Sequence, residues 1–491
     1  MPDIDTGALV RVTEPSAREN GQARVLLTGG TVWTTPVLEG GASYHRRWLC
    51  ADDAAMLDHV LGESLVTMTP AAARLVRRLR LLGLVDVAHE DDSSVSPTDV
   101  DVVVPCHDPP ASLASLLASL GRLGFASITV VDDASTPPLL WEHVADGSSE
   151  VAIRRSSERL GPGEARNLGA MVGSARWLLF IDADVELPDP EAWWNALASG
   201  LADPDVAGAA PRIMTTTSRK GSVADVESSS GTYDRGPVSS VVRPHGVVPF
   251  VPGASLVLRR ECFELLGGFD VSLGGGEDVD LVWRVVDRCG LVLYRADAVV
   301  HHPAPASIRE WLGRRWRYGR SQAALGLRHH RHISSLDISP WSLAMFTLFF
   351  GGGRRRPFAA TLIGIVSVAA LARDLRPWSD RPAVDALRLV STGTVAAGSA
   401  TAACVRRVWA PGLVAVAVVC RPPRRWLTIA FVAPSLGAPW PAVALERCGD
   451  LAGALGVWRG VIEQRTLRPL LPKWVAVDDL LVDERAAATR R

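Results

Sequence analysis

The sequence predicts an α/β protein built around an open, mainly parallel sheet. Three apolar, β-branched runs, VDVVVP, SITVVDD and ARWLLFIDAD, alternate with helical stretches between about residues 99 and 310. Runs of this kind are typical of strands buried on both faces, and the strand and helix alternation is typical of a doubly wound sheet. Ligands of such sheets bind at the carboxyl ends of the strands, where acidic residues gather in this sequence.

The 491-residue chain is too long for one ordinary core and predicts several domains. Residues 1–95 hold strand-like VLLTGG and helix-like AAARLVRRLRLLGLV, which indicate a small N-terminal α+β domain. The acidic segment HEDDSSVSPTD is typical of a linker. Residues 96–310 then form the sheet domain, and residues 311–491 form a helical, apolar C-terminal region.

Composition excludes several classes of function. A net charge of −1 argues against a nucleic-acid partner, because such domains carry a strong basic excess. The seven cysteines are widely separated and lack the spacing of a zinc site. The N-terminus MPDIDTGALV has no apolar run typical of a secretory signal, so we expect the catalytic part to face the cytoplasm.

Beyond residue 310, apolar runs such as WSLAMFTLFF and PFAATLIGIVSVAALA are separated by the basic segments RRR and RPPRR. A helix that spans a bilayer needs about 20 apolar residues, and these runs are too short or barely sufficient. Interfacial or re-entrant helices fit equally well, and a soluble helical domain is the alternative. We expect association with the inner face of the cell membrane.

Two carboxylates with the spacing of a metal site follow the third strand. Asp182 and Asp184 are separated by one residue, so they lie on one side of an extended chain. Oxygen ligands of this kind suit Mg²⁺ or Mn²⁺ held together with substrate phosphates. One of His301 and His302, after the strand LVLYRADAVV, would complete the coordination, and His301 is the choice here. A solvated turn and a pair of surface histidines are the alternatives.

Two further segments suit a nucleotide. Asp132 and Asp133 end the second strand, where a carboxylate accepts hydrogen bonds from a uracil imide or ribose hydroxyls, although such residues also begin helices as caps. In GPGEARNLG, glycines allow close approach to a ligand, and Arg166 and Asn167 lie in the first turns of a helix. Arg166 would pair with phosphate or with the carboxylates of the metal site.

A candidate base follows the glycine-rich stretch GGFDVSLGGG. Glu277 and Asp278 lie at the start of a helix, where capping alone also favours carboxylates. A group transfer that inverts the anomeric carbon of a sugar needs one carboxylate to take the proton from the acceptor hydroxyl. Asp278 is the first candidate for this role and Glu277 the second.

The segments VDVVVPCHD, VVDDAST, GPGEARNLG, FIDADVELP, VPGASLVLRR and GGGEDVDLVWR resemble, in order and spacing, the motifs of family 2 glycosyltransferases. The resemblance implies a GT-A fold, a UDP- or GDP-sugar donor, Mg²⁺ or Mn²⁺, and inversion at the anomeric carbon. It also implies that Asp108 and Asp133 contact the nucleoside, that Asp182 and Asp184 meet ribose and metal, and that Asp278 is the base.

A narrower resemblance, to mycofactocin-system glycosyltransferases, adds REWLGRRWRYG and LDISPWSLAMF. It implies transfer of glucose from UDP-glucose to a peptide-derived redox cofactor. The N-terminal domain is similar to the winged-helix-like peptide-binding domains of ribosomal-peptide maturation systems, but TVWTTPVLEGGASYHRRWL replaces a shorter loop. Leu312 stands where the QxxRW motif of processive synthases has Gln, so processive synthesis is not supported.

Two other functions remain as alternatives. A transferase that builds cell-wall or lipid-linked glycans would use the C-terminal apolar helices to meet a lipid carrier. A non-catalytic nucleotide-binding scaffold belongs to a different class. The presence of both a metal site and a candidate base disfavours the scaffold, which needs neither.

Overall fold

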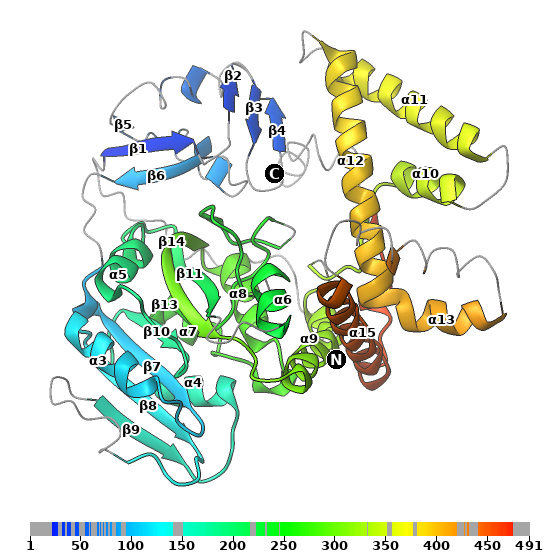
Figure 1. Ribbon diagram of the computed structural model, residues 1–491. Helices are drawn as coiled ribbons and strands as arrows, with labels where there is room; N and C mark the ends of the chain where they lie inside the picture. Colours follow the sequence, from blue (N-terminus) through cyan, green and yellow to red (C-terminus); the bar gives the residue numbers. More distant parts are fainter. Residues whose placement is uncertain are drawn as a thin grey trace, which may run out of the picture. The chain divides into compact units, whose positions relative to one another are not determined.

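A computed structural model gives the architecture of most of the chain beyond residue 95 (Figure 1). It describes residues 95–140, 151–216, 222–230, 233–244, 246–330, 332–350, 356–376, 381–419 and 440–474, together with scattered positions before residue 90 and near residue 430. In the N-terminal segment, β1 (Gln22–Leu27) pairs antiparallel with β5 (Val66–Thr67) and β6 (Val85–His89). The strands β2 (Val32–Thr34), β3 (Val37–Gly40) and β4 (His45–Trp48) form a second antiparallel sheet. Most of this segment lies outside the described residues, so its winged-helix-like form stays a prediction.

The central element is an eight-stranded sheet with the order β12-β14-β11-β13-β10-β7-β8-β9. Its strands are β7 (Val100–Cys106), β8 (Ser127–Asp133), β9 (Val151–Ser156), β10 (Trp177–Ile181), β11 (Val206–Thr216), β12 (Ser240–Val241), β13 (Ser255–Arg259) and β14 (Leu291–Pro303). The neighbours β10, β7, β8 and β9 run parallel, as do β11 and β14. The open α/β sheet typical of the GT-A fold is therefore confirmed.

Six of the eight strands run in one direction, as the sequence predicted, but the sheet also contains two antiparallel strands. Strand β13 runs antiparallel to both β10 and β11, and the short β12 runs antiparallel to β14. The physical reason lies in the chain just before β13, which reaches the sheet at the carboxyl end of β10. There the amide of Asp182 donates to the carbonyl of Ala254 over 2.9 Å. A strand entering at that end must run back against β10.

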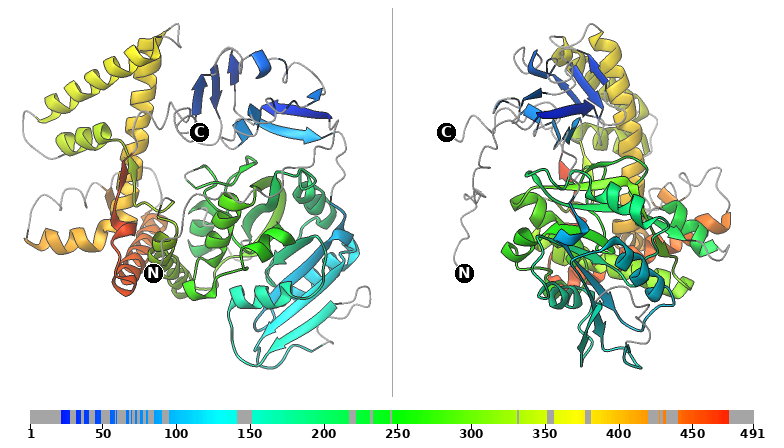
Figure 2. Two further views of the ribbon diagram at one scale, coloured as in Figure 1. Left: turned by 180° about the vertical axis from the view of Figure 1, so that it is seen from behind. Right: turned by 90° about the vertical axis from the view of Figure 1, so that its left-hand side faces the viewer.

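Helices cover both faces of this sheet (Figure 1 and Figure 2). One apolar cluster joins α3 (Leu113–Leu123) and α5 (Pro190–Ala198) to the sheet, and the other joins α4 (Pro162–Ala170), α7 (Arg260–Leu265) and α8 (Glu277–Arg288). Helix α4 lies especially close to the sheet, since a Cβ added at Gly169 would be 2.2 Å from Cγ1 of Val103. This contact holds the first turns of α4 beside the carboxyl ends of the strands.

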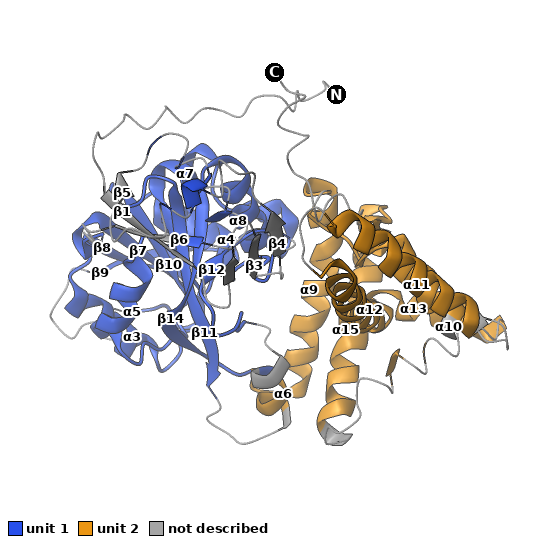
Figure 3. Cartoon of the chain, turned by 90° about the horizontal axis from the view of Figure 1, so that it is seen from above, with its two compact units in different colours: residues 1–220, 227–304 blue, residues 221–226, 305–491 orange. Residues whose placement is uncertain are grey.

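The chain divides into two compact units, residues 1–220 with 227–304 and residues 221–226 with 305–491 (Figure 3). The second contains the start of α6 (Ser222–Ser230), then α9 (Ile308–Arg328), α10 (Pro340–Phe350), α11 (Arg356–Leu375), α12 (Pro382–Cys404), α13 (Ala410–Val419) and α15 (Trp440–Gln464), with a π-helical turn at Val405–Trp409 and a small parallel pair of β15 (Asp337–Ile338) and β16 (Lys473–Trp474). The predicted C-terminal helical region is confirmed.

Glycines let α9 and α15 approach each other closely. A Cβ added at Gly319 of α9 would lie 2.1 Å from the carbonyl oxygen of Gly453, and one added at Gly456 of α15 would lie 2.1 Å from that of Trp316. Such contacts leave no room for a larger residue. An ion pair between Arg320 and Glu463 at 2.6 Å links the same two helices.

Two stretches of this unit are long and apolar enough to cross a membrane. Residues Pro357–Leu375 have a mean hydropathy of 1.7 with 11% of the most apolar window buried, and Pro382–Val419 have 1.6 with 28% buried. Large apolar side chains, among them Phe358, Val395 and Val419, are exposed on these helices. Most of their apolar surface is thus left uncovered by the rest of the described chain.

Candidate functional site

One edge of the sheet brings the candidate residues together. The parallel strands β7, β8 and β10 end there at residues 106, 133 and 181, and β13 begins at the same edge because Ile181 pairs with Ser255. Strand β14 runs in the same direction as β10 and ends there too, where the chain at residue 301 pairs with Glu186. Side chains that are far apart in the sequence therefore lie together at this edge of the sheet.

A three-residue cluster at this edge fits a divalent metal ion. One ligand atom from each of Asp182, Asp184 and His302 lies within 4.8 Å of the other two. The Nε2 atom of His302 is 3.5 Å from Oδ1 of Asp184. Two carboxylates and an imidazole are a donor set that suits Mn²⁺. Mg²⁺ would bind mainly to the carboxylate oxygens.

His302, rather than the chosen His301, meets the two carboxylates. His301 uses its backbone amide and carbonyl in a pair of 2.9 Å hydrogen bonds with Glu186, and it is not part of the cluster. Consecutive side chains of an extended strand point to opposite sides, so only one member of this histidine pair faces the carboxylates. His302 is therefore the histidine whose position fits the cluster.

Arg166 bonds to Asp182 and lies near the candidate bases. Its side chain is buried, and Nη2 donates to Oδ1 of Asp182 over 2.6 Å. Burial alone would lower the pKa of this guanidinium, but the negative charges of Asp182, Asp278 and Glu277 outweigh it and raise the pKa. Gly253 packs against Arg166 and Asp278, since an added Cβ would lie 3.3 Å from Cζ of the arginine and 3.2 Å from Cβ of the aspartate.

The two candidate bases begin α8 and differ in their surroundings. Both oxygens of Asp278 accept backbone amides, Oδ2 from Gly253 at 3.0 Å and Oδ1 from Val279 at 2.8 Å. Burial raises the pKa of Glu277, and the neighbouring charge of Asp278 adds to that effect while Arg166 opposes it. The pair thus contains one carboxylate held in place by the backbone and one with increased basicity.

Asp132 and Asp133 have separate structural tasks. Asp132 is fully buried and accepts hydrogen bonds from the amides of Ser135 at 2.9 Å and Leu139 at 3.1 Å and from Arg155. Burial would raise the pKa of Asp132, but the bonds from Ser135, from the Leu139 amide and from Arg155 outweigh it and lower the pKa. Asp132 therefore shapes the turn after β8 instead of facing a ligand.

Asp133 holds the loop before α4, and Asp108 lies exposed beside it. The oxygens of Asp133 accept the amides of Leu160 at 2.6 Å and Gly161 at 2.9 Å. Asp108 has a φ of 51°, and its Oδ1 accepts the amide of Thr136 at 3.1 Å. A non-glycine residue in this left-handed region is uncommon and often marks a functional turn. With its side chain 64% exposed, Asp108 is accessible to a ligand.

Asn167 serves the protein itself. Its amide group donates to the carbonyl of Phe269 over 2.9 Å and accepts the amide of Phe269 over 2.9 Å. These two hydrogen bonds hold the glycine-rich segment that precedes α8 against α4. Asn167 therefore acts on the position of Glu277 and Asp278, where the sequence predicted a donor contact.

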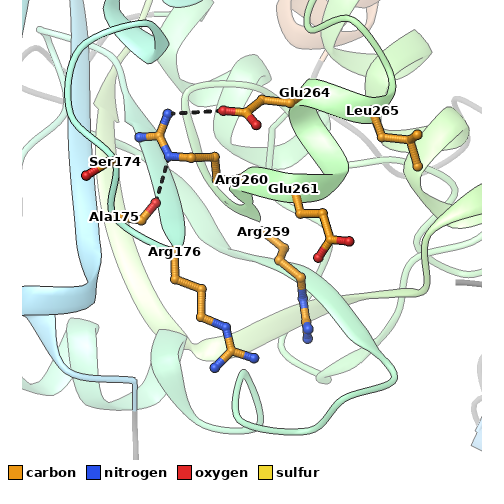
Figure 4. A pocket seen from close by; sticks show the side chains of 8 residues that line it. All are labelled: Ser174, Ala175, Arg176, Arg259, Arg260, Glu261, Glu264 and Leu265. Carbon is orange, nitrogen blue, oxygen red and sulfur yellow. Dashed lines mark hydrogen bonds and ion pairs between the residues drawn. The ribbon is translucent and has the colours of Figure 1, made fainter. Parts of the chain in front are cut away.

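A cavity of about 430 Å³ lies elsewhere (Figure 4). It is lined by Ser174, Ala175, Arg176, Arg259, Arg260, Glu261, Glu264 and Leu265. These residues surround the start of β10 and the end of β13, at the edge opposite Asp182, about 16 Å away at 3.3 Å per strand residue. Arg260 is turned to the carbonyl of Ala175 and to Glu264. The cavity is separate from the clustered carboxylates.

Sequence reasoning missed the roles of Gly253 and Tyr233. Gly253 lies in the segment VPGASLVLRR, and its amide donates a hydrogen bond to the Asp278 carboxylate. The sequence signal for this role was a glycine just before a strand that begins where the acidic residues gather. Tyr233 stacks on His302, and nothing in the local sequence marks it because the two residues are far apart in the chain.

The chain is similar in sequence to known glycosyltransferases. The model of the family described as Glycosyl transferase family 2 matches residues 101–265. The pre-mycofactocin glycosyltransferase of Mycobacterium tuberculosis is 30% identical over 411 residues, which cover 80% of this chain and 86% of that protein. The O-antigen biosynthesis protein RfbC of Myxococcus xanthus is 27% identical over 225 residues, or 43% of this chain and 18% of that protein.

Among solved structures, the chain is similar to the mannosyltransferase PcManGT from Pyrobaculum calidifontis in complex with GDP-Man and Mn²⁺. The identity is 18% and the TM-score 0.40, and the match covers 74% of this chain and 88% of that one.

Proposed function

Because this chain is a glycosyltransferase that belongs to family 2, we propose that it transfers a hexose from a nucleoside diphosphate sugar to an acceptor hydroxyl with inversion at the anomeric carbon. The observation that carries the proposal is the position of Arg166. Its buried guanidinium donates to Asp182 and packs, together with Asp278, against Gly253. A metal-bound donor and a deprotonated acceptor are thereby assigned to neighbouring positions of one edge.

Asp182, Asp184 and His302 would hold Mn²⁺ or Mg²⁺. When bound, the ion neutralises the charge that develops on the departing diphosphate. Arg166 keeps Asp182 oriented through the 2.6 Å hydrogen bond. The exposed Asp108 is assigned to the nucleoside, as a hydrogen-bond acceptor for imide and hydroxyl groups. Asp133, which the resemblance also assigns to the nucleoside, is buried and holds the adjacent loop through the amides of Leu160 and Gly161.

Asp278 is the proposed base and Glu277 the second candidate. The Gly253 amide fixes the Asp278 carboxylate at the start of α8, and a fixed carboxylate can meet an acceptor hydroxyl in one orientation. The raised pKa of Glu277 makes its carboxylate a stronger proton acceptor than an ordinary glutamate, which supports the alternative. Substitution of each residue separately distinguishes the two.

The proposed donor is UDP-glucose and the proposed acceptor a small peptide-derived redox cofactor of the mycofactocin type. The support is the relative from Mycobacterium tuberculosis, whose similarity extends over 80% of this chain, beyond the sheet domain alone. An acceptor domain formed by the N-terminal segment is part of the same proposal.

The C-terminal helices support a location at the inner face of the cell membrane. A 19-residue apolar helix is about 28 Å long, close to the thickness of a bilayer core. Exposed apolar side chains such as Phe358 and Val419 are costly in water and stable in lipid. Flotation of the full chain with liposomes of neutral and anionic lipids tests this, and recovery only in the unbound fraction would contradict it.

The same exposed helices favour a second candidate, transfer to a lipid-linked or cell-wall glycan. An acceptor in the membrane would then be presented directly to the enzyme. Incubation with radiolabelled UDP-glucose and either a polyprenyl phosphate or a peptide-derived acceptor distinguishes the two, because only the true acceptor class takes up label.

The test of the main proposal is calorimetric titration of the full chain with UDP-glucose, GDP-mannose and UDP, each with Mn²⁺ and with chelator. Metal-dependent binding of one sugar nucleotide is the expected result. Asp184→Ala should weaken this binding, whereas Asp278→Asn should bind the donor nearly as wild type does and transfer no sugar.

The matched control is Glu277→Gln, which removes the neighbouring charge at the same helix start. Transfer that survives in Asp278→Asn and disappears in Glu277→Gln would reverse the two roles. Binding of UDP or a sugar nucleotide by the wild type without any sugar transfer would favour the non-catalytic scaffold. Absence of binding under all conditions would contradict the proposal.

A further inference from the structure

The ring of Tyr233 stacks on the imidazole of His302. The ring centroids are 4.9 Å apart and the ring planes are inclined by 29°. The His302 side chain is 6% exposed, so its orientation depends on the groups packed around it. Asp184 meets its Nε2 edge, and Tyr233 covers one of its faces.

The segment that carries Tyr233 is fixed to the sheet. Arg212 of β11 forms two parallel hydrogen bonds to Asp234, Nε to Oδ1 at 2.8 Å and Nη2 to Oδ2 at 2.7 Å. Asp234 also accepts the amide of Gly236 at 2.8 Å, and the carbonyl of Gly236 accepts the hydroxyl of Tyr294 at 2.7 Å. Paired bonds of this type fix direction as well as distance. The residue next to Asp234 is therefore held in one place.

The hydrogen bonds of His302 decide which ring nitrogen can bind a metal. Its Nδ1 atom is 3.0 Å from the carbonyl oxygen of Pro303. A carbonyl only accepts, so Nδ1 carries the proton, and in the neutral ring Nε2 keeps its lone pair. Nε2 is the nitrogen that faces Asp184. The tautomer is thus suited to a metal, provided that the ring keeps its present rotation.

We propose that Tyr233 is a positioning residue for the metal site: its ring, held by the Arg212–Asp234 pair, keeps His302 turned with Nε2 toward Asp182 and Asp184. The inference rests on the proposed function in that it takes these three residues as the metal ligands. Groups that orient a metal-binding histidine typically change metal affinity by about 10- to 100-fold.

The test is the dissociation constant of Mn²⁺, measured by electron paramagnetic resonance of the free ion with a fixed, saturating concentration of UDP. Tyr233→Leu removes the ring and should weaken Mn²⁺ binding about tenfold. Tyr233→Phe keeps the ring and should stay within about twofold of wild type. Arg212→Gln leaves Tyr233 in the chain but releases its segment, and it should weaken binding by a smaller factor.

Four results are informative in different ways. Wild type that binds no Mn²⁺ would refute the metal site and the proposed function with it. Loss of binding in His302→Ala, with Tyr233→Leu and Arg212→Gln both equal to wild type, would refute only the positioning role. Equal loss in the Phe and Leu variants would assign the effect to the hydroxyl, against stacking. A lower thermal midpoint of Tyr233→Leu than of wild type in chelator, together with Tyr233→Phe that restores neither the midpoint nor Mn²⁺ affinity, would indicate a general structural role.

Discussion

Replacement of Arg166 by Met removes a buried positive charge that lies near three carboxylates. Arg166 donates to Asp182 over 2.6 Å, and Asp278 and Glu277 add to the charge that favours its protonated form. Its side chain is 5% exposed and that of Asp182 is 27% exposed. The substitution thus removes a guanidinium that is shielded from water, while Asp182 keeps some contact with water.

The size of the effect follows from these exposures. Hydrogen bonds to charged groups contribute about 1.5–3 kcal/mol, and breaking a fully buried pair costs about 3–5 kcal/mol. Because Asp182 is partly solvated, we expect about 3 kcal/mol for Arg166→Met and about 2 kcal/mol of coupling with Asp182→Asn in a double-mutant cycle. Mn²⁺ should stabilise Arg166→Met more than wild type, since it restores positive charge.

The assay is urea-dependent hydrogen exchange of peptides that cover β10 and α4, analysed by mass spectrometry. These peptides report the opening of the sheet unit alone, so unfolding of the C-terminal unit does not enter the result. A coupling energy below about 0.5 kcal/mol, the usual limit of additivity, would refute the reasoning. It would mean that the guanidinium and the carboxylate contribute independently.

Three further changes have directions set by the structure. Glu277 has a raised pKa in the folded protein, so wild-type stability falls as pH rises above about 4, and Glu277→Gln should be increasingly stabilising toward neutral pH in urea titrations. Asp132 has a lowered pKa, so Asp132→Asn should destabilise at neutral pH and lose that effect below about pH 4, and a constant difference would contradict the assignment. Gly169→Ala would place its Cβ 2.2 Å from Val103 and should cost about 1–3 kcal/mol, whereas the matched Gly313→Ala, with open space around it, should stabilise by up to about 1 kcal/mol in thermal unfolding.

Local patterns were sufficient for the class of fold and for the place of the site. Strands with apolar residues on both faces, such as residues 177–181, are recognisable because burial on both sides leaves no polar period. The acids that follow them lie at one edge because parallel strands end together. The place of Asp182 and Asp184 after β10 followed from the sequence, although they lie in a turn closed by the Val185 amide on the Asp182 carbonyl and not on an extended chain. The place of Glu277 and Asp278 at a helix start followed from the glycine-rich stretch before them, and the family resemblance implies their roles.

The partners of these residues were a matter of tertiary structure. Asn167 binds the backbone of Phe269, and the Gly253 amide binds Asp278, in pairs separated by 102 and 25 positions. No local pattern contains both members of such a pair. The antiparallel direction of β13 is likewise not readable from local sequence, because it depends on where the preceding segment meets β10.

Adjacent residues show the same division most clearly. The sequence presents Asp132 beside Asp133 and His301 beside His302 as near equivalents. In the structure Asp132 is enclosed by Ser135, Leu139 and Arg155, and His302 alone joins the metal carboxylates. The type of side chain, and hence the chemistry available, was determined by the sequence itself. Which of two identical neighbours faces the site was decided by the tertiary structure, because successive residues of a strand point to opposite sides and only the packed neighbours define which side is the site.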